Sequence, residues 1–324
     1  MKKINRNEGV ALIITLMIIA LLVAVVVEFN RIAIADIEVS RNFGNEKKVL
    51  FLMISGTDAI KEFLRLDGVY TKSDTLLEHW ALSEPLFISA GSMIEEGKIS
   101  GTIVDENGKI NVNSLVSDKG TFDETQKTLW LRLLTQNRFN LTEEEANTII
   151  HGVKDWIDKD DEISGIYGAE NSFYQGKGYG CANSSLNILE EMLLINGMTK
   201  TIFYGDRFRE GVRPYFTVYG GSQINVNTAP IPILMALSDD MTEDIAMEWD
   251  TIRRDETNKA LLLEKDWYKK FWPYETPLPE KLLTVSSDHF TVYIKGTLGE
   301  TMKQVKTVIY RSNDLSKIVY WQEL

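Results

Sequence analysis

The chain has 324 residues, of which 47 are acidic and 35 basic, so its formal net charge is −12. Such an acidic surface argues against a protein that binds nucleic acid by neutralising phosphates. Cys181 is the only cysteine, which excludes an intrachain disulfide. The three histidines, His79, His151 and His289, are too scattered to predict a zinc site.

Residues 10–27 form an apolar run of 18 residues without charge or proline, in which Thr15 is the one polar member. A helix needs roughly 20 apolar residues to cross a bilayer, so the run predicts a transmembrane segment. Lys2, Lys3 and Arg6 precede it, and cations on that flank favour a cytoplasmic N-terminus. We therefore expect a single-pass protein whose remaining residues lie on the far side of the membrane.

The helix is expected to continue beyond the membrane. The first proline is Pro85, so residues 10–66 can form one helix about 85 Å long. Apolar side chains between Val49 and Leu64 follow the i, i+3, i+4, i+7 spacing of a face packed on a domain. The pair Asp67-Gly68 resembles a helix stop.

Two simpler interpretations of the N-terminus compete with this one. Ala33-Ile34-Ala35 is a small-x-small triplet that a signal peptidase could cut, and a plain membrane anchor would have the same apolar run. The run is too long for a signal peptide, and Glu28 and Arg31 separate it from the triplet.

The next segments read as extended chain. We expect strands over 87–89 and 98–104, a turn over 105–108 and an extended segment over 110–113. The Asn-Gly pair in this turn is typical of a hairpin corner with positive φ. Strand character returns over 290–295, 304–310 and 317–321, which are rich in Val, Ile, Thr and Tyr.

Helical spacing dominates between these groups of strands. It runs from Glu124 to about Asp161, with a capping box at Thr142 to Glu145, and further helices are expected over 185–194, 233–237, 246–253 and 259–265. The order is helix, strands, helical insertion, strands. We therefore predict an α+β fold in which a long N-terminal helix packs on an antiparallel sheet interrupted by a large all-helical insertion.

An internal echo occurs within this order. Residues 109–115 read KINVNSL and residues 223–229 read QINVNTA, each an extended run leading into a helix through a capping side chain. The second copy also resembles the start of helix-hairpin-helix modules, some of which bind DNA. Because no Gly-rich hairpin with basic neighbours follows, we interpret the echo as a structural repeat.

Residues 154–174 form an acidic loop, KDWIDKDDEISGIYGAENSFY. Calcium takes six to eight oxygen ligands, and clustered carboxylates supply them. The loop does not match an EF-hand, because the sixth position from Asp158 is Ile163 where glycine is required. A chain that folds back through Gly168 could still gather Asp158, Asp160 and Glu170 around one ion, and the alternative is an acidic loop in solvent.

Catalytic motifs are absent from the sequence. It contains no G-x-S-x-G, H-E-x-x-H or Walker pattern, and the glycine-rich residues 176–180 lack the strand-to-helix context of a phosphate loop. A paired-carboxylate hydrolase built from the acidic loop has little support. We expect a protein that is not an enzyme.

The N-terminal junction resembles a type IV pilin-like leader. In such leaders a short basic segment ends in glycine, a prepilin peptidase cuts after it, and the new N-terminus is methylated; here the junction is Gly9-Val10. Most of these proteins carry glutamate at the fifth mature position, where this chain has Ile14. The K-type minor pseudopilin of the type II secretion system also lacks this acid.

This resemblance extends over nearly the whole chain. It also rests on the INVNS and INVNT segments and on the run from Asp155-Trp156-Ile157-Asp158 to Gly168-Ala169-Glu170. It implies a pilin fold with a large helical insertion and calcium bound in the acidic loop, with Asp155 and Asp161 as further candidate ligands. The implied divisions are a leader over 1–9, a transmembrane segment over 10–27, a pilin-like helix and first strands over 28–119, the insertion over 120–280 and the last strands over 281–324.

The function implied is structural. A minor pseudopilin of this type sits in the bacterial inner membrane with a periplasmic head, at the tip of a pseudopilus that helps to export folded proteins across the outer membrane. Its expected partners are the I- and J-type minor pseudopilins, the major pseudopilin, the inner-membrane secretion platform and the prepilin peptidase. The alternative is a membrane-anchored periplasmic binding domain unrelated to filaments.

Overall fold

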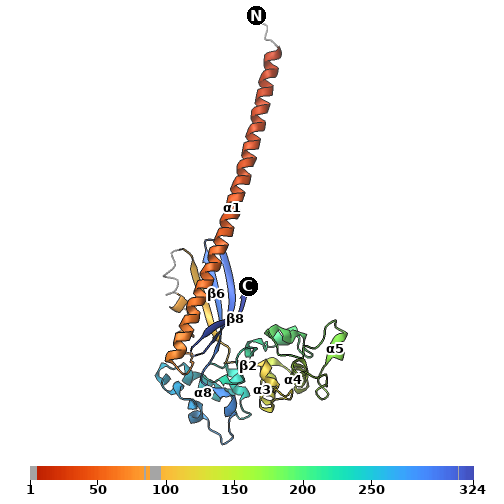
Figure 1. The fold of residues 1–324 in the computed structure, drawn as a ribbon, viewed down its shortest axis with the longest axis vertical. Helices are drawn as coiled ribbons and strands as arrows, with labels where there is room; N and C mark the ends of the chain where they lie inside the picture. The colour runs from red at the N-terminus through yellow and green to blue at the C-terminus, as the bar shows by residue number, and fades with distance from the viewer. Residues whose placement is uncertain (1–5, 84, 88–95, 313) are drawn as a thin grey trace.

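In the computed structural model, which describes residues 6–83, 85–87, 96–312 and 314–324, one long helix projects from a globular head (Figure 1). This helix, α1, runs from Arg6 to Tyr70 without a break, so the predicted long helix is confirmed. Residues 10–27 are exposed along its free half. Within the described part of the chain, α1 is the one helix long and apolar enough to cross a membrane.

The predicted helix stop at Asp67-Gly68 is wrong, because α1 continues to Tyr70. Gly68 has another purpose. A Cβ atom at this position would lie 3.3 Å from the Nε atom of Arg311, which packs against the helix surface there. The glycine therefore marks a close approach between the helix and a strand.

The sheet has four antiparallel strands in the order β1-β6-β7-β8. Their bounds are Lys98–Asp105, His289–Leu298, Thr301–Arg311 and Ser316–Glu323, which confirms the strands expected from the sequence in these regions. The outer half of α1 covers one face. At Gly296 a Cβ would lie 2.9 Å from a methyl group of Val49 and 3.0 Å from Met53, so a glycine in β6 lets the helix pack closely.

The turn after β1 is not the expected hairpin corner. β1 pairs with β6, nearly 200 residues further along, while β2 (Ile110–Asn111) pairs in parallel with β3 (Phe216–Thr217). Neither Asn107 nor Gly108 has a positive φ. Glycine is needed because a Cβ at Gly108 would lie 2.8 Å from the hydroxyl of Thr228.

The strand expected over 87–89 is not formed at its start. Residues 85–87 are helical, and Ser89 lies outside the described residues. The Phe87 side chain is buried against β1, where a Cβ at Gly101 would lie 2.5 Å from its ring. Its apolar character therefore reflects packing against the sheet.

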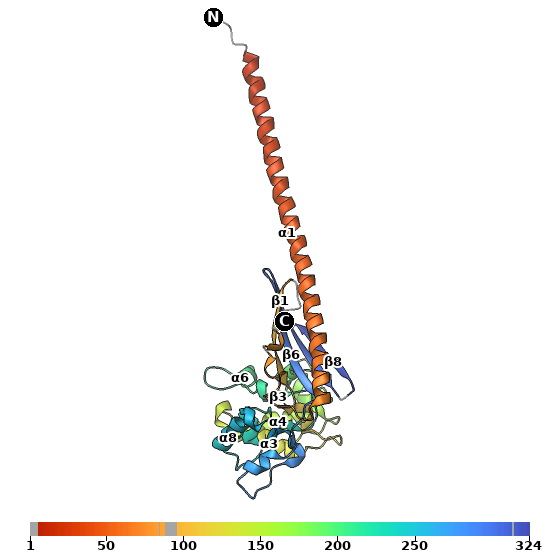
Figure 2. The same ribbon diagram turned by 90° about the vertical axis from the view of Figure 1, so that its left-hand side faces the viewer.

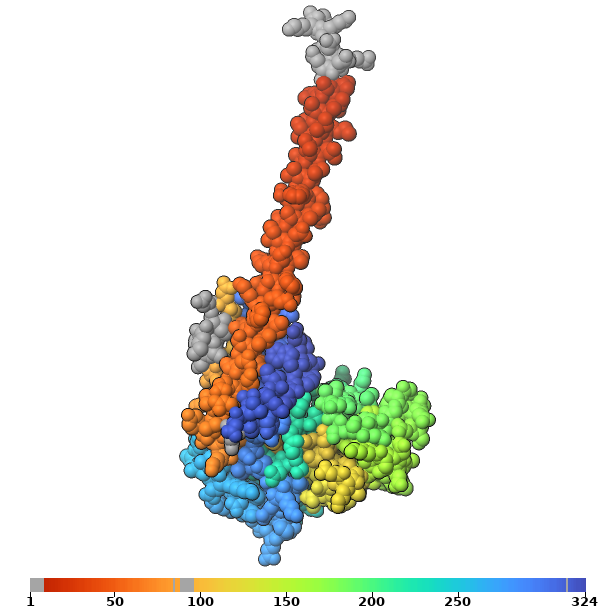
Figure 3. Space-filling view, viewed as in Figure 1, coloured from red at the N-terminus to blue at the C-terminus, as the bar shows by residue number. Residues whose placement is uncertain are grey.

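The insertion lies beyond the end of the sheet that is farthest from the N-terminus, and extends to one side of it (Figures 1 and 3). Its described α-helices are α3 Glu124–Leu134, α4 Glu143–Ile157, α5 Asn171–Gln175, α6 Lys200–Tyr204, α7 Ile231–Ala236 and α8 Glu243–Arg254. It has a hydrophobic core, which includes residues from Leu77 to Val285 and contains Trp130 and Trp249, apart from the core between α1 and the sheet.

Short 3-10 helices connect these elements. They are Val112–Leu115, Asn137–Phe139, Leu189–Leu194, Arg213–Tyr215, Glu256–Asn258, Leu261–Leu263, Trp267–Phe271 and Glu280–Leu282. The helix expected over 185–194 is thus reduced to the second half, and the one over 259–265 to a single turn. The capping box at Thr142 and Glu145 is confirmed.

The two echoed segments have the same geometry. Each begins as a two-residue parallel strand, β2 in the first copy and β4 (Ile224–Asn225), paired with β5 (Leu283–Thr284), in the second. In each copy the first asparagine accepts a hydrogen bond from the N–H two residues later, over 3.0 Å at Asn111 and 2.9 Å at Asn225. The second asparagine donates to a distant carbonyl, Asn113 to Leu186 and Asn227 to Leu262. The amides are used inside the protein, which supports a structural repeat.

Candidate metal centre

The last turn of α4 carries two carboxylates on one face, because Asp155 and Asp158 are three residues apart. Asp158 is the C-terminal cap of the helix, and its N–H donates to the carbonyl of Lys154 over 2.9 Å. The chain then loops back to Glu170, the N-terminal cap of α5. One carboxylate oxygen from each of Asp155, Asp158 and Glu170 lies within 4.8 Å of the others, and the three side chains are 0%, 2% and 2% exposed.

Several oxygens of this cluster have no donor. Oδ1 of Asp158 and both carboxylate oxygens of Glu170 are buried and make no hydrogen bond within the part of the chain that the structure describes. The other oxygens are occupied: Asp155 accepts from the N–H of Ser164 over 3.1 and 3.2 Å, and Lys154 forms an ion pair with Asp158. Buried acceptors without donors are costly, and a cation would satisfy them.

The electrostatics point the same way. Burial, and then the charges of Asp155 and Asp158, raise the pKa of Glu170 to about 7. Burial also raises the pKa of Asp158, although the hydrogen bond from Lys154 opposes the rise. The Lys154 ammonium thus faces the three carboxylates of Asp155, Asp158 and Glu170. Their mutual repulsion is only partly compensated, and a divalent ion would relieve it.

The loop is shaped around these carboxylates by Gly168. A Cβ at this position would lie 2.2 Å from Oδ2 of Asp155 and 2.7 Å from the backbone nitrogen of Ser164. Its own N–H donates to the carbonyl of Ser164 over 3.1 Å. Glycine is therefore required for the loop to close over Asp155.

The structure gathers a different triad from the one expected. Asp155 takes the place expected for Asp160, which is exposed and accepts from the N–H of Glu162 over 2.9 Å. Asp161 is exposed too and accepts from the side chain of Asn171 over 2.6 Å. The physical reason is that α4 ends at Ile157, so residues after Asp158 no longer follow the helical spacing that places Asp155 beside it.

The donor set suits a hard cation. Three carboxylates and no imidazole match the ligands that calcium prefers, whereas soft metals favour thiolate. Cys181 lies nearby, and its Sγ donates to the carbonyl of Asp155 over 3.0 Å. Burial, and then the charge of Glu170, raise the pKa of its thiol to about 12, so Cys181 remains protonated and contributes no thiolate ligand.

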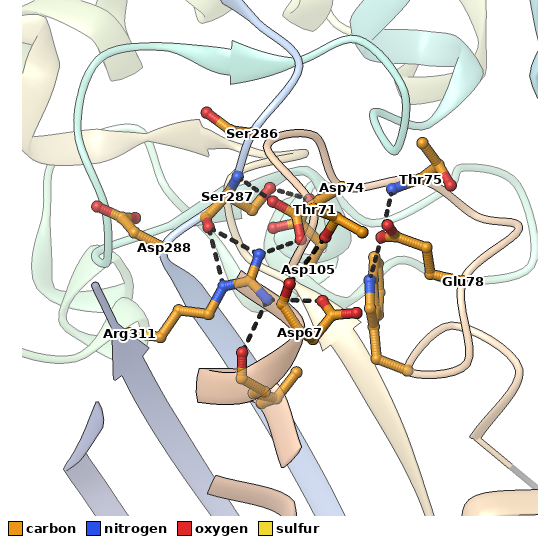
Figure 4. A network of polar contacts seen from close by, with 12 residues as sticks. Asp67, Thr71, Asp74, Thr75, Glu78, Asp105, Ser286, Ser287, Asp288 and Arg311 are labelled. Carbon is orange, nitrogen blue, oxygen red and sulfur yellow. Dashed lines mark hydrogen bonds and ion pairs between the residues drawn. The ribbon is translucent and has the colours of Figure 1, made fainter. Parts of the chain in front are cut away.

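A second acidic cluster lies where the head joins the end of α1 (Figure 4). Asp67, Asp74 and Glu78 approach one another within 4.8 Å. This cluster already contains a cation, Arg311, which pairs with Asp67 over 2.8 Å and also with Asp74. Glu78 accepts from the N–H of Thr75 and from the ring N–H of Trp80 over 3.0 and 2.8 Å. The guanidinium supplies the positive charge that these carboxylates need.

Arg311 lies at the end of β7, and its side chain is 5% exposed. Its Nη1 donates to the carbonyl of Leu64 over 3.1 Å, and its Nε and Nη2 donate to the carbonyl of Ser287 over 3.4 and 3.3 Å. Together with the pairs to Asp67 and Asp74, these bonds join α1, the chain after it, the returning chain and β7. We refer to Arg311 with these four partners as the Arg311 joint.

The insertion is bonded to this joint through Asp105. The Asp105 carboxylate is buried at the end of β1 and accepts from Asn225, Thr228 and Ser287 over 3.2, 2.5 and 2.6 Å. Asn225 also donates to the carbonyl of Asp74 over 3.1 Å. Burial raises the pKa of Asp74 to about 7, and Arg311 limits this rise. Sequence reasoning missed this cluster, because its members are separated by up to 247 residues and no local pattern joins them.

Comparison with known proteins supports one family. A family model described as "Type II secretion system (T2SS), protein K" matches residues 108–220, which include the whole acidic loop. The type II secretion system protein K of Aeromonas hydrophila is 23% identical over 100% of this chain and 98% of its own length. That of Pseudomonas aeruginosa is 26% identical over 95% of this chain and 90% of its own length.

The fold agrees with these relatives. The crystal structure of the GspK-GspI-GspJ complex from the enterotoxigenic Escherichia coli type 2 secretion system contains a chain similar to this one, with a TM-score of 0.66 at 18% identity. The match covers 88% of this chain and 99% of that one.

The chain is similar to the type II secretion system protein K over its whole length.

Members of the protein K family are minor pseudopilins, structural proteins without enzymatic activity that are anchored in the inner membrane. The similarity agrees with the sequence expectations of a non-enzymatic protein and of a membrane anchor, for which α1 supplies one long apolar segment.

The Arg311 joint predicts a strong effect of removing its cation. Arg311→Met should destabilise the protein by about 3–5 kcal/mol, because the buried Asp74 and the half-buried Asp67 would be left without their partner. Chemical unfolding of the detergent-solubilised chain measures this change. Arg254→Met is the control, since Arg254 is exposed and its loss should cost less than about 1 kcal/mol. Equal, small effects of the two changes would show that the joint does not stabilise the head.

The acidic loop predicts stabilisation by calcium. Calcium at about 100 times its Kd should stabilise the protein by about 2.7 kcal/mol, and the rise in Tm should be larger at pH 8 than at pH 6. Protonation of Glu170 below its pKa of about 7 competes with the ion. Without calcium the pH dependence of folding stability has the opposite sign. Because folding raises the pKa of Glu170 to about 7, this group contributes stability that is present at low pH and is lost as the pH rises through 7.

Matched variants separate the cluster from the rest of the loop. Asp158→Asn with Glu170→Gln should abolish the calcium-induced rise in Tm, whereas Asp160→Asn with Asp161→Asn, which alters two exposed neighbours, should retain most of it. The same Tm with calcium and with a chelator at pH 8 would contradict a metal centre here.

Proposed function

We propose that this protein occupies the tip of the type II secretion pseudopilus, where it initiates or caps assembly and supports the export of folded proteins across the outer membrane. The position of the insertion is the observation that carries this proposal. It fills the space beyond the end of the sheet that is farthest from the N-terminus of α1 (Figure 1). In a filament whose subunits stack with parallel long helices, the next subunit outward would need this space.

The free part of α1 supports lateral assembly. Phe29, Ile32, Val39 and Phe43 are 69%, 52%, 67% and 61% exposed, and their spacing of three, seven and four residues places them along one stripe of the helix. An apolar stripe of this kind is stabilised when another helix covers it. We propose that the long helices of other pseudopilins do so.

Ile14 supports the terminal position. In a stack, a carboxylate at the fifth mature position would pair with the positively charged N-terminus of a neighbouring subunit. A carboxylate without such a partner is costly in lipid or in a helix bundle. A subunit with no neighbour above it can dispense with the acid, and this chain carries isoleucine there.

The similarity to the GspK chain of the solved complex suggests the partners. We propose that I- and J-type minor pseudopilins bind this protein in a tip complex, and that the major pseudopilin and the inner-membrane secretion platform contact this complex. A prepilin peptidase would first cut between Gly9 and Val10, both of which are exposed at the start of α1. The mature chain then has a net charge of −14.

The division of the chain follows from this role. The proposed parts are the leader over 1–9, the membrane segment over 10–27, the pilin-like helix and first strands over 28–119, the insertion over 120–280 and the last strands over 281–324. Calcium held by Asp155, Asp158 and Glu170, with Asp160 and Asp161 in the outer loop, would fix the acidic loop on the insertion.

Leader processing predicts a defined mass. The protein isolated from cells that contain a prepilin peptidase should begin at Val10 and carry one methyl group on its N-terminus. Intact-mass spectrometry and N-terminal sequencing measure both properties. A Gly9→Val variant should keep its leader. An intact Met1 in the unmodified chain, or a start after Ala35, would contradict assembly through α1.

The tip position predicts the result of restoring the acid. Ile14→Glu should lower the yield of disulfide cross-links between cysteines placed in the stripe of α1 and in I-type and J-type partners, because the added carboxylate has no partner above it. Ile14→Val controls for the loss of the larger side chain and should assemble normally. Assembly and secretion that improve in Ile14→Glu would refute a terminal position.

A further inference from the structure

A loop over residues 205–211 projects from the insertion directly after α6 (Figure 2). It contributes no residue to either hydrophobic core among the described residues, although Phe203 just before it and Val212 just after it are fully buried. The loop is therefore anchored at both ends and free at its tip.

The tip is held in one shape by its own hydrogen bonds. The Asp206 carboxylate accepts from the N–H groups of Phe208 and Arg209 over 2.7 and 3.1 Å, and the N–H of Asp206 donates to the carbonyl of Arg209 over 3.0 Å. At the base, the N–H of Glu210 donates to the carbonyl of Arg138 over 3.0 Å. A segment bonded in this way loses little entropy when it binds a partner.

Gly205 allows this shape. Its φ is +85°, and a Cβ there would lie 2.7 Å from the backbone nitrogen of Gly211. Any other residue at this position would strain the crossing of the two loop arms. The two glycines therefore form a narrow neck below the tip.

The tip carries Arg207 and Phe208, which are exposed, and Arg209, which is half-buried. The Phe208 side chain is 87% exposed. Neither arginine forms an ion pair within the described residues, whereas Arg132, nearer the core, pairs with Asp239 over 2.6 Å. The Nε atom of Arg209 is enclosed without a hydrogen-bond partner in the same described part of the chain.

Asp206 and Glu210 equal the two arginines in number, but their carboxylates are engaged within the protein: Asp206 accepts from the loop N–H groups, and Glu210 pairs with Arg138 over 3.4 Å and accepts from the hydroxyl of Tyr215. The charged groups left for a partner are therefore the two arginines, beside an exposed aromatic ring.

We propose that residues 205–211 are a docking loop for a second protein, which receives Phe208 in an apolar socket rimmed by carboxylates that pair with Arg207 and Arg209. Aromatic residues and arginine dominate binding energy at protein interfaces, above all where they are preorganised. The arginine fork matches a carboxylate with two parallel hydrogen bonds. This loop is separate from the stripe on α1, so the inference is independent of the tip assembly proposed above.

A membrane surface fits the geometry less well. The apolar run ends at Val27, and the first residue of α1 buried in the head is Val49, 22 positions later. This length of helix holds the head about 33 Å from the anchoring bilayer. The loop lies farther out still, level with the end of the sheet that is far from the N-terminus (Figure 2). The arginines would be attracted to either surface, and it is this position that favours an acidic protein partner over the lipid of the anchoring bilayer.

The test places a photoreactive phenylalanine analogue at position 208 of the full-length chain in the cells that produce it. After illumination we expect an adduct with another protein, and mass spectrometry should map it to an apolar residue close to at least one Asp or Glu. Arg207→Glu with Arg209→Glu should lower the adduct yield by about tenfold or more, because both carboxylate contacts become repulsive.

Two controls make the result specific. Lys259→Glu with Lys265→Glu changes the net charge of the insertion equally at two exposed positions and should leave the yield unchanged. The analogue at Ile166, which is also 87% exposed, controls for exposure alone and should not give the same adduct. Adducts with lipid or with a second copy of this chain, no adduct at position 208, or a yield insensitive to Arg207→Glu with Arg209→Glu would each overturn the proposal.

Discussion

The structure depends on one buried guanidinium. Arg311 joins α1, the chain that leaves it, the chain that returns from the insertion and strand β7. Bringing Asp67 and Asp74 together inside the protein is unfavourable unless a cation is placed between them. Arg311 can pair with both carboxylates in one arrangement of these four segments. The joint therefore selects how the insertion is attached to the head.

The consequences of this joint extend through the insertion. Asp105 and Asn225 connect it to the second echoed segment, and the first echoed segment is bonded to the insertion through Asn113. The insertion can therefore be large and retain a core of its own while it keeps a defined direction relative to α1. A fixed direction matters for a subunit at the end of a filament, because it decides which space is blocked and which loops face outward.

The acidic loop shows how much local sequence can reveal about a site. The concentration of carboxylates between Asp155 and Glu170 predicted a cation-binding loop, and three of these side chains do converge. Which three depended on where α4 ends. The spacing of three residues between Asp155 and Asp158 is a helical signal that was available in the sequence, whereas the outward direction of Asp160 follows from the path of the loop. Gly168 could be interpreted once Asp155 was known to lie against it.

The sequence by itself determined the long helix, the last three strands, the capping box and the interruption of a sheet by a helical insertion. These features arise from periodicity, end signals and composition, which act between residues close in the chain. The tertiary structure alone decided that β1 pairs with β6 instead of β2, and that Gly68 and Gly108 are contact points rather than a helix stop and a hairpin corner. It also decided that Arg311 joins the buried carboxylate of Asp74 to the half-buried one of Asp67. Each of these depends on burial and on partners more than 100 residues away. Local sequence patterns contain no information about which distant residue becomes the partner.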